Sequence, residues 1–388
     1  MGQRIADNWQ LYLLLLIPVV LTFVYKYIPM YGIQIAFRDY KASRGILGSK
    51  WVGLEWFERF FTAPTCGRMI RNTILLSLFS LLWGFPVPII LSLWQYRGRV
   101  ASNHNQYGRM WECPDYFRLD GKDVLFVSPQ EMRPIGLEFH AGNGTVCMIG
   151  EADENKHLIR ENVHAIDYGI DFYAPQTLLT PDGRRIMIAW MQNWDTARSQ
   201  PVTNRICGQM TLPRELAVRD GRLIQVPVRE LENYYGEKIS YRNVPLSTET
   251  ILAGIKGRTL DMTVNVRPAN GSSMYRSFRI NLAKDGEYVT TVKYKPEQGI
   301  VRVDRSRCGF RFDIVHVREF PVYSKHGNIK LRCVLDRHSL ELFVNDGEQA
   351  ASFVLHTDVS ADVISFEADG EVLMDVEKYD LVFNPEDE

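Results

Sequence analysis

The residues of this chain best suited to proton-transfer chemistry stand in one short run, Met110-Trp111-Glu112-Cys113-Pro114-Asp115. A carboxyl group such as that of Glu112 can give a proton to a leaving oxygen or take one from water when its pKa is close to the working pH. Asp115 follows too closely in the sequence to lie opposite Glu112 in a rigid strand. A reaction that needs two facing carboxylates must therefore draw the second one from another part of the chain.

Trp111 to Asp115 resembles the acid/base motif of glycoside hydrolase family 32, the invertases and other β-fructosidases. The resemblance implies retaining hydrolysis of sucrose, sucrose 6-phosphate or fructan. In that reaction Glu112 protonates the leaving glycosidic oxygen and then activates the water that releases the fructosyl group. This role implies a pKa of Glu112 raised by burial and by a nearby second carboxylate. The structural alternative is an exposed glutamate at the end of a strand.

The family's nucleophile is an Asp in an Asn-Asp-Pro-Asn run upstream of the acid/base motif, and no such run occurs here. Asn345-Asp346-Gly347 has the composition of a hairpin turn. Asn193-Trp194-Asp195 follows the motif and lacks the proline, and Arg38-Asp39-Tyr40 belongs to a different part of the chain. We therefore assign no nucleophile. Because losing a covalent nucleophile costs several orders of magnitude in rate, we predict no useful hydrolysis by this chain.

Three runs downstream resemble strands of the family's later propeller blades: 167–176, 188–191 and 208–215. Within them, the resemblance makes Asp171, Tyr173 and Trp190 candidate substrate-binding residues. An aromatic face against a furanose ring is a common arrangement. The alternative for each of the three is ordinary packing inside a propeller.

Short apolar runs between turn residues predict a mainly β fold after residue 94. Residues 123–127 and 185–190 are such runs, and Arg219-Asp220-Gly221-Arg222 predicts a hairpin turn. From about residue 237 longer alternating strands begin, and 335–347 resembles the central hairpin of the family's C-terminal β-sandwich. We predict an incomplete five-bladed β-propeller at 94–230 and a β-sandwich at 237–388. The sandwich should fold alone, so limited proteolysis should leave a resistant piece starting near residue 230.

The first 93 residues have a different character. Residues 8–25 and 72–96 contain no charged side chain, and each is long enough for the roughly 20 residues that cross a bilayer. Two transmembrane helices are therefore predicted before the β part. A signal peptide is the alternative for the first segment, and a buried core helix is the alternative for the second.

Residues 8–93 also resemble the start of a sugar ABC-transporter permease. The runs that carry this resemblance are 13–18, 27–31, 36–40, 51–54 and 72–73. Such a permease has about six spans around its pathway, so two spans cannot form one alone. No flexible linker separates the two parts, and the boundary cuts inside a domain on both sides, which favours a truncated chimera over an evolved fusion. A non-functional permease fragment and a membrane-tethered non-catalytic β module are the alternatives to the hydrolase.

Composition limits the partners. The chain has 388 residues and a net charge of -1. It therefore lacks the excess of charge that would indicate a nucleic-acid partner. The expected partners are a fructose-containing sugar and, through residues 1–93, a membrane. No Cys-x-x-Cys pair occurs among the six cysteines, so we predict no metal and no cofactor.

Localisation follows from the N-terminal segment. If that segment is real, the protein is attached to a membrane, and the family's orientation places the hydrolase part in the cytoplasm. The eight basic and three acidic residues between the two predicted spans favour the opposite orientation.

Overall fold

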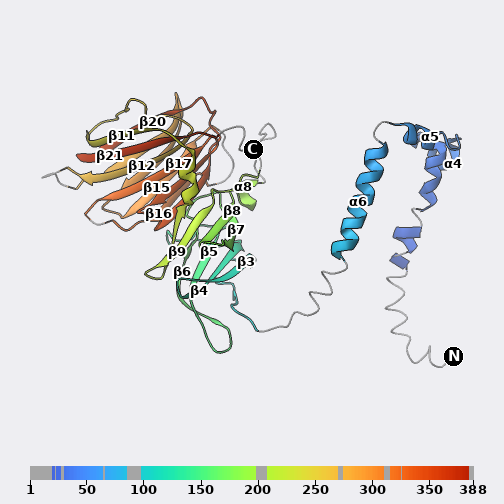
Figure 1. Ribbon diagram of the computed structural model, residues 1–388, viewed down its shortest axis with the longest axis horizontal. Coiled ribbons are helices and arrows are strands. Elements are labelled where there is room, and N and C mark those ends of the chain that lie inside the picture. Colours follow the sequence, from blue (N-terminus) through green and yellow to red (C-terminus); the bar gives the residue numbers. More distant parts are fainter. Residues whose placement is uncertain are drawn as a thin grey trace. The chain divides into compact units, whose positions relative to one another are not determined.

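The computed structural model describes residues 20–21, 23–27, 30–63, 66–84, 98–197, 208–269, 274–309, 315–324 and 326–383 (Figure 1). The chain divides into two compact units, residues 1–96 and residues 97–388.

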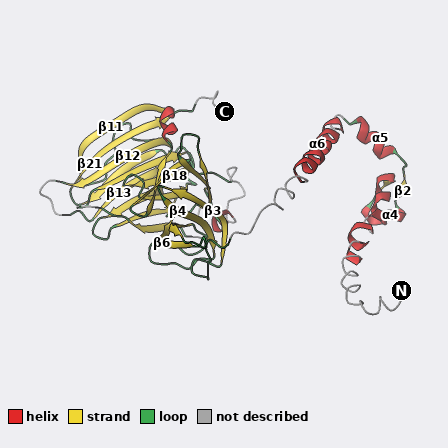
Figure 2. Cartoon of the chain, turned by 60° about the horizontal axis from the view of Figure 1, so that its bottom comes forward, coloured by secondary structure: helices red, strands yellow, loops and turns green. Residues whose placement is uncertain are grey.

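The first unit is mostly helical where it is described (Figure 2). Its elements are η1 Phe23–Tyr27, η2 Tyr31–Phe37, η3 Ala42–Arg44, α4 Gly45–Gly48, α5 Glu55–Thr62 and α6 Cys66–Gly84, with β1 Arg38–Asp39 paired to β2 Lys50–Trp51. The longest helix is α6, with 19 residues.

The two predicted transmembrane helices gain no support from this unit. Among the described residues, none of the helices combines the length and the apolar character needed to cross a membrane. Helix α6 carries Arg68 and Arg71 near its start, which lowers its mean hydropathy. Most of the predicted segment 8–25 lies outside the described residues, and so does 85–96 of the segment 72–96.

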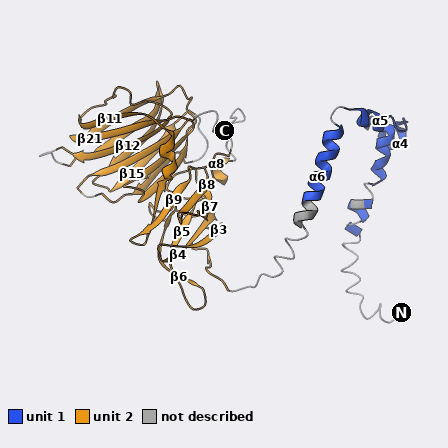
Figure 3. Cartoon of the chain, viewed as in Figure 1, with its two compact units in different colours: residues 1–96 blue, residues 97–388 orange. Residues whose placement is uncertain are grey.

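The second unit starts with two four-stranded antiparallel sheets that resemble propeller blades (Figure 3). The first contains β3 Met110–Leu119, β4 Lys122–Gln130, β5 Val146–Ala152 and β6 Leu158–Ala165, and the second contains β7 Tyr173–Leu179, β8 Arg185–Trp190, β9 Arg214–Arg219 and β10 Arg222–Pro227. A short helix, α8 Trp194–Ala197, follows β8. An apolar core that includes Phe117, Phe126 and Met187 joins the two sheets.

Each of these sheets contains a two-residue turn of the same kind. Asp120-Gly121 joins β3 to β4, and Asp220-Gly221 joins β9 to β10. All four residues have φ between 48° and 81°, the left-handed conformation that type I′ hairpins require. The predicted hairpin at 219–222 is therefore confirmed.

The remainder of the unit is a β-sandwich, in agreement with the predicted fold class. One sheet contains, in spatial order, β11 Tyr235–Leu246, β21 Val372–Leu381, β12 Thr259–Pro268, β17 Ile329–Asp336, β18 Ser339–Val344 and β19 Gln349–Val354. The other sheet contains, in spatial order, β16 Val317–Pro321, β15 Ile300–Arg307, β14 Tyr288–Lys295, β13 Ser277–Asp285 and β20 Val363–Asp369. Alternate residues of β12 and β13, such as Leu260, Met262, Phe278 and Ile280, are fully buried between the sheets. A 3-10 helix, η4 Arg229–Tyr234, connects the sandwich to the blade-like sheets.

Buried charged residues join the blade-like sheets to the sandwich. Arg214 of β9 is fully buried, and its Nη1 lies 2.9 Å from Asp167 Oδ2 while its Nη2 lies 2.7 Å from Glu341 Oε2 of β18. Arg305 of β15 forms a second buried ion pair with Asp171. Residues 97–388 form one compact unit. Independent folding of the sandwich stays a prediction, which limited proteolysis would test.

A glycine, Gly169, allows the segment after β6 to lie directly against strand β19 of the sandwich. A Cβ atom on Gly169 would lie 2.0 Å from the backbone oxygen of Ser352. The segment around Gly169 forms hydrogen bonds with β19, from Tyr168 N to Ala350 O and from Asp171 N to Ser352 O. Only glycine fits at this position without moving the β19 backbone.

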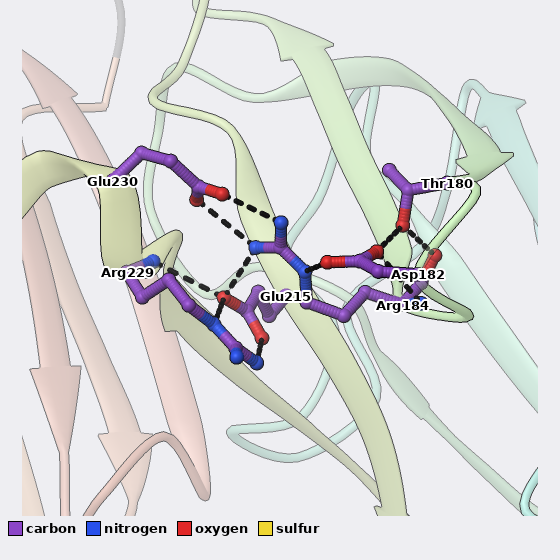
Figure 4. Close-up of polar contacts among 6 residues, drawn as sticks. All are labelled: Thr180, Asp182, Arg184, Glu215, Arg229 and Glu230. Atoms are coloured by element: carbon purple, nitrogen blue, oxygen red, sulfur yellow. Dashed lines mark hydrogen bonds and ion pairs between the residues drawn. The ribbon is translucent and has the colours of Figure 1, made fainter.

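A second charged cluster lies at the surface, beside η4 (Figure 4). Arg184 donates to three carboxylates, those of Asp182, Glu215 and Glu230. Arg229 also donates to Glu215, over 3.0 Å from Nη2 to Oε2. The cluster connects the β7–β8 turn, β9 and η4.

Candidate active site

The carboxylate of Glu112 lies where β3, β7 and α8 meet. Glu112 is half-buried, and its Oε2 accepts a hydrogen bond of 3.0 Å from the hydroxyl of Tyr173. The same oxygen accepts a hydrogen bond of 3.1 Å from Nε1 of Trp194 in α8. Glu112 lies on β3 and Tyr173 on β7, and the pairing register of each strand shifts at this point.

The two register shifts correspond to two β-bulges. The register of β3 against β4 shifts between Glu112 and Asp115, and that of β7 against β8 shifts between Tyr173 and Gln176. In each bulge the residue after the functional side chain has positive φ, 46° at Cys113 and 52° at Ala174. A proline follows each of them. Positive φ is uncommon for non-glycine residues, and bulges re-aim side chains near functional sites.

Hydrogen bonds hold the two bulges against each other. Asp115 Oδ2 accepts from the backbone N–H of Thr177 over 2.7 Å, and Gln176 Nε2 donates to the carbonyl of Cys113. Ser128 of β4 accepts a hydrogen bond at its Oγ from the backbone N–H of Ala174. Asp115 is thus a structural residue that ties β3 to β7.

The hydrogen bonds on Glu112 decide its charge. Burial raises the pKa of Glu112, but donors on Gln130, Trp194 and Tyr173 lower it, and the net pKa lies below the ordinary value. Hydrogen bonds to a carboxylate favour its charged form. Glu112 is therefore ionised at neutral pH, and the predicted rise in its pKa is wrong for this structure. The physical reason is that neutral donors outweigh the effect of partial burial.

Tyr173 supports both protonation states of Glu112. Burial, followed by the hydrogen bond with Glu112, raises the pKa of Tyr173, so the phenol stays neutral. Its hydroxyl has one proton but lies 3.0 Å from Glu112 Oε2 and 2.9 Å from the carbonyl oxygen of Ser128. When Glu112 is ionised, Tyr173 can donate to it. When Glu112 is protonated, Tyr173 can donate to Ser128 and accept from Glu112.

Two family models match the chain, one described as the glycosyl hydrolases family 32 N-terminal domain over residues 91–227 and the other as the glycosyl hydrolases family 32 C terminal over residues 230–381. The chain belongs to glycoside hydrolase family 32. Both matches lie at or after residue 91, so the permease resemblance of residues 8–93 stays a prediction from the sequence.

Curated relatives and solved structures agree with this family. The sucrose-6-phosphate hydrolase of Staphylococcus xylosus is 30% identical over 291 residues, which cover 74% of this chain and 58% of the relative. The raffinose invertase of Escherichia coli is 33% identical, with 72% of this chain and 57% of the relative covered. The chain thus spans somewhat more than half the length of these relatives.

Two solved structures show the same fold over the same share of the chain. The β-fructofuranosidase of Bombyx mori is 26% identical with a TM-score of 0.59, and the match covers 74% of this chain and 58% of that one. The sucrose-6-phosphate hydrolase of Lactobacillus gasseri has a TM-score of 0.63 and the same coverage, at 18% identity.

The candidate sugar-binding residues of this family-32 chain fall into two places. Tyr173 contacts Glu112 directly. Trp190 pairs with Tyr173 in the sheet, and its ring packs edge-on against Trp194 with the centroids 5.3 Å apart. Asp171 is 1% exposed and ion-paired with Arg305, so the structure places it in the junction with the sandwich.

The sequence reasoning missed Trp194 and Gln130. Trp194 stands in a run that we considered only as a nucleophile motif, yet its side chain is 41% exposed and donates to Glu112. The position of an aromatic residue just after the end of a predicted strand was the feature that could have indicated a role for Trp194 in the site. Gln130 ends β4 and had no recognisable motif. Among the described residues, no group of three His, Cys, Asp or Glu side chains could hold a metal ion.

Proposed function

We propose that this chain carries the acid/base half of a β-fructosidase site, which acts with retention on sucrose, sucrose 6-phosphate or fructan. The observation that supports this most directly is the Glu112 carboxylate, held between Tyr173 and Trp194 at two matched bulges. Glu112 is the acid that protonates the leaving oxygen and the base that later activates water. Tyr173 keeps a hydrogen bond to Glu112 in both states. Trp190 and Trp194 offer an aromatic surface for the furanose ring.

We further propose that the chain by itself does not complete the reaction. A retaining mechanism needs a second carboxylate about 5 Å from the first, and no run of this sequence fits the family's nucleophile. The lowered pKa of Glu112 is consistent with this, because a second carboxylate nearby would raise it. Only the protonated fraction of Glu112 can perform the acid step in this chain, and that fraction grows as the pH falls toward the lowered pKa of Glu112.

An external nucleophile tests the proposal. Sucrose and an aryl β-fructofuranoside are incubated with the chain, with and without sodium azide. We expect no fructose release without azide, and formation of fructosyl azide with it. The reaction is run at mildly acidic pH, where part of Glu112 is protonated. Azide bonds to the anomeric carbon, the bond to the leaving oxygen breaks, and the proton of a protonated Glu112 moves to that oxygen.

Matched variants separate Glu112 from the rest of the chain. Glu112→Gln should abolish the azide reaction on sucrose, whose leaving group needs the acid, and should reduce it less on the aryl substrate. Glu151→Gln removes a largely exposed carboxylate of β5 and should change neither rate. Hydrolysis without azide, or an azide reaction that survives Glu112→Gln on sucrose, would contradict the proposal.

Cellular placement depends on the N-terminal unit. If residues 8–25 and 72–96 cross a bilayer, the protein stays in the membrane fraction after alkaline carbonate extraction. Release into the supernatant would contradict membrane attachment and leave the hydrolase proposal unchanged.

A further inference from the structure

The outer face of the five-stranded sheet carries a groove that has no part in the Glu112 site. The groove measures about 550 Å³, within the size range of small-molecule sites. Side chains of β13, β14 and β15 form its floor, including Arg279, Lys293 and Arg302. Its lining holds six cationic side chains and three carboxylates: Arg279, Lys284, Lys293, Lys295, Arg302 and Arg307 against Glu249, Asp304 and Glu367.

Three of these cations stand side by side across the sheet. Arg279 of β13 is directly opposite Lys293 of β14, and Lys293 is directly opposite Arg302 of β15. Adjacent strands are about 4.8 Å apart, and like charges in opposite positions are destabilising. A row of three cations therefore costs folding free energy unless negative charge lies against it.

Among the described residues, the carboxylates that form ion pairs with this row lie at its two ends. Arg279 Nη1 lies 2.8 Å from Glu367 Oε2 of β20. Arg302 Nη1 lies 3.2 Å from Glu319 Oε1 of β16, and its Nη2 lies 3.3 Å from Asp304 Oδ2. Each arginine is thus neutralised by a carboxylate on its outer side.

Lys293 at the centre lacks such a partner. Within the described part of the chain, no carboxylate oxygen lies within 4.0 Å of its Nζ, although the side chain is half-buried. Burial lowers the pKa of Lys293, and so do Arg279 and Lys295, while Glu367 and Asp369 raise it. The centre of the groove therefore holds a cation without a carboxylate in ion-pair contact among the described residues.

Uncharged polar groups surround this cation. Asn281 and Thr291 are opposite each other in the next row of the sheet, and Thr291 Oγ1 donates to Asn281 Oδ1 over 3.3 Å. Ser306 of β15 lines the same groove. The Asn281 amide donates to Ser365 Oγ over 3.1 Å, and Thr291 donates to Asn281. The cationic side chains are therefore the main donors that the groove offers to a phosphate.

We propose that this groove binds a phosphate group, either as free inorganic phosphate or as the monoester of a small sugar, with Lys293 as its central cation. The ligand's negative charge neutralises the row Arg279–Lys293–Arg302, and its oxygens accept from the surrounding donors. The proposal is independent of the Glu112 chemistry, because the groove lies on a different sheet.

Calorimetric titration of the full chain tests the proposal at low ionic strength. The probes are fructose 6-phosphate, inorganic phosphate and fructose. We expect fructose 6-phosphate and inorganic phosphate to compete for one site. Their relative affinities show whether the groove prefers a sugar monoester or free phosphate.

Lys293→Gln should weaken phosphate binding at least tenfold. The control Lys330→Gln makes the same charge change on β17, at a lysine that is paired with Asp346, and should not weaken phosphate binding. Because Lys293→Gln removes like-charge repulsion, it should be at least as stable as the parent in phosphate-free buffer, which shows that it folds. Equal affinity in both variants, or no phosphate-dependent heat at millimolar ligand, would overturn the proposal.

Protection from acylation gives a second readout. A water-soluble acetylating reagent should modify Lys293 in the free protein, and inorganic phosphate should slow that modification without slowing the modification of Lys330. Unchanged modification of Lys293 at saturating phosphate would also overturn the proposal.

Discussion

Two arginine-centred clusters join the blade-like sheets to the rest of the second unit, and they differ in burial. Arg214 is fully buried with Asp167 and Glu341, which are also buried. Arg184 is in a similar arrangement with Asp182, Glu215 and Glu230, but the side chains of Asp182 and Glu230 are about half exposed. Breaking a buried pair leaves an uncompensated charge away from water, whereas a surface charge is resolvated. The same chemistry therefore has very different effects on stability in the two places.

The largest expected effect comes from Arg214→Ala. It leaves two buried carboxylates without their cation, so the free energy of unfolding should fall by about 3–5 kcal/mol. Urea denaturation of residues 97–388 measures this. A loss below about 1 kcal/mol would show that the buried cluster behaves like a surface one.

Asp171→Asn should have the next largest effect. It leaves Arg305 without its carboxylate but keeps an acceptor for the N–H of Val354, so we expect a loss of about 2–3 kcal/mol. Binding of fructose, measured by calorimetry, should be unchanged where the variant is folded. A selective loss of fructose binding with normal stability would restore the role in sugar binding that the sequence suggested.

Tyr173→Phe probes the half-buried Glu112 site, which is intermediate in burial between the Arg214 cluster and the Arg184 cluster. Removing one donor should cost about 1 kcal/mol and raise the pKa of Glu112 relative to the parent chain. Because the folded-state pKa of Glu112 is lowered, its contribution to stability is present above the unfolded pKa and is lost as the pH falls through the folded pKa. The variant should therefore lose less stability than the parent on acidification. Carbon-13 NMR of labelled glutamate checks the pKa directly, with Trp194→Phe as a second variant expected to shift it the same way.

Arg184→Ala should have the smallest effect. Exposed ion pairs contribute about 0.2–1 kcal/mol each and are screened by salt, so the loss of stability should be small and should shrink in 1 M sodium chloride. A salt-independent loss comparable to that of Arg214→Ala would remove the contrast between the two clusters.

The sequence predicted much of the local structure. Residues 185–190 were predicted as a strand and form β8, and 219–222 forms the predicted turn. Asn345-Asp346-Gly347 forms a turn with positive φ at all three residues, in agreement with its interpretation as a turn instead of a nucleophile. Strand alternation and turn chemistry are local properties, so a single sequence contains them.

The site was only partly predictable. Glu112 and Tyr173 were named from family resemblance, and the structure brings them together across 61 residues of sequence. The bulges at Cys113 and Ala174, which aim these side chains, have no periodic pattern in the sequence. Trp194 was overlooked because its contact with Glu112 spans 82 residues.

Short runs of residues were enough to predict the β architecture of residues 94–388, the family and the acid/base candidate. Which charges are buried, and what they contact, depends on how distant segments pack together. Asp171 belongs to the junction because Gly169 lets β19 approach and because Arg305, 134 residues away, neutralises it. The pKa of Glu112 is set in the same way by donors from separate elements. Electrostatic effects depend on distance in space and on exclusion of water, and neither quantity can be read along the chain.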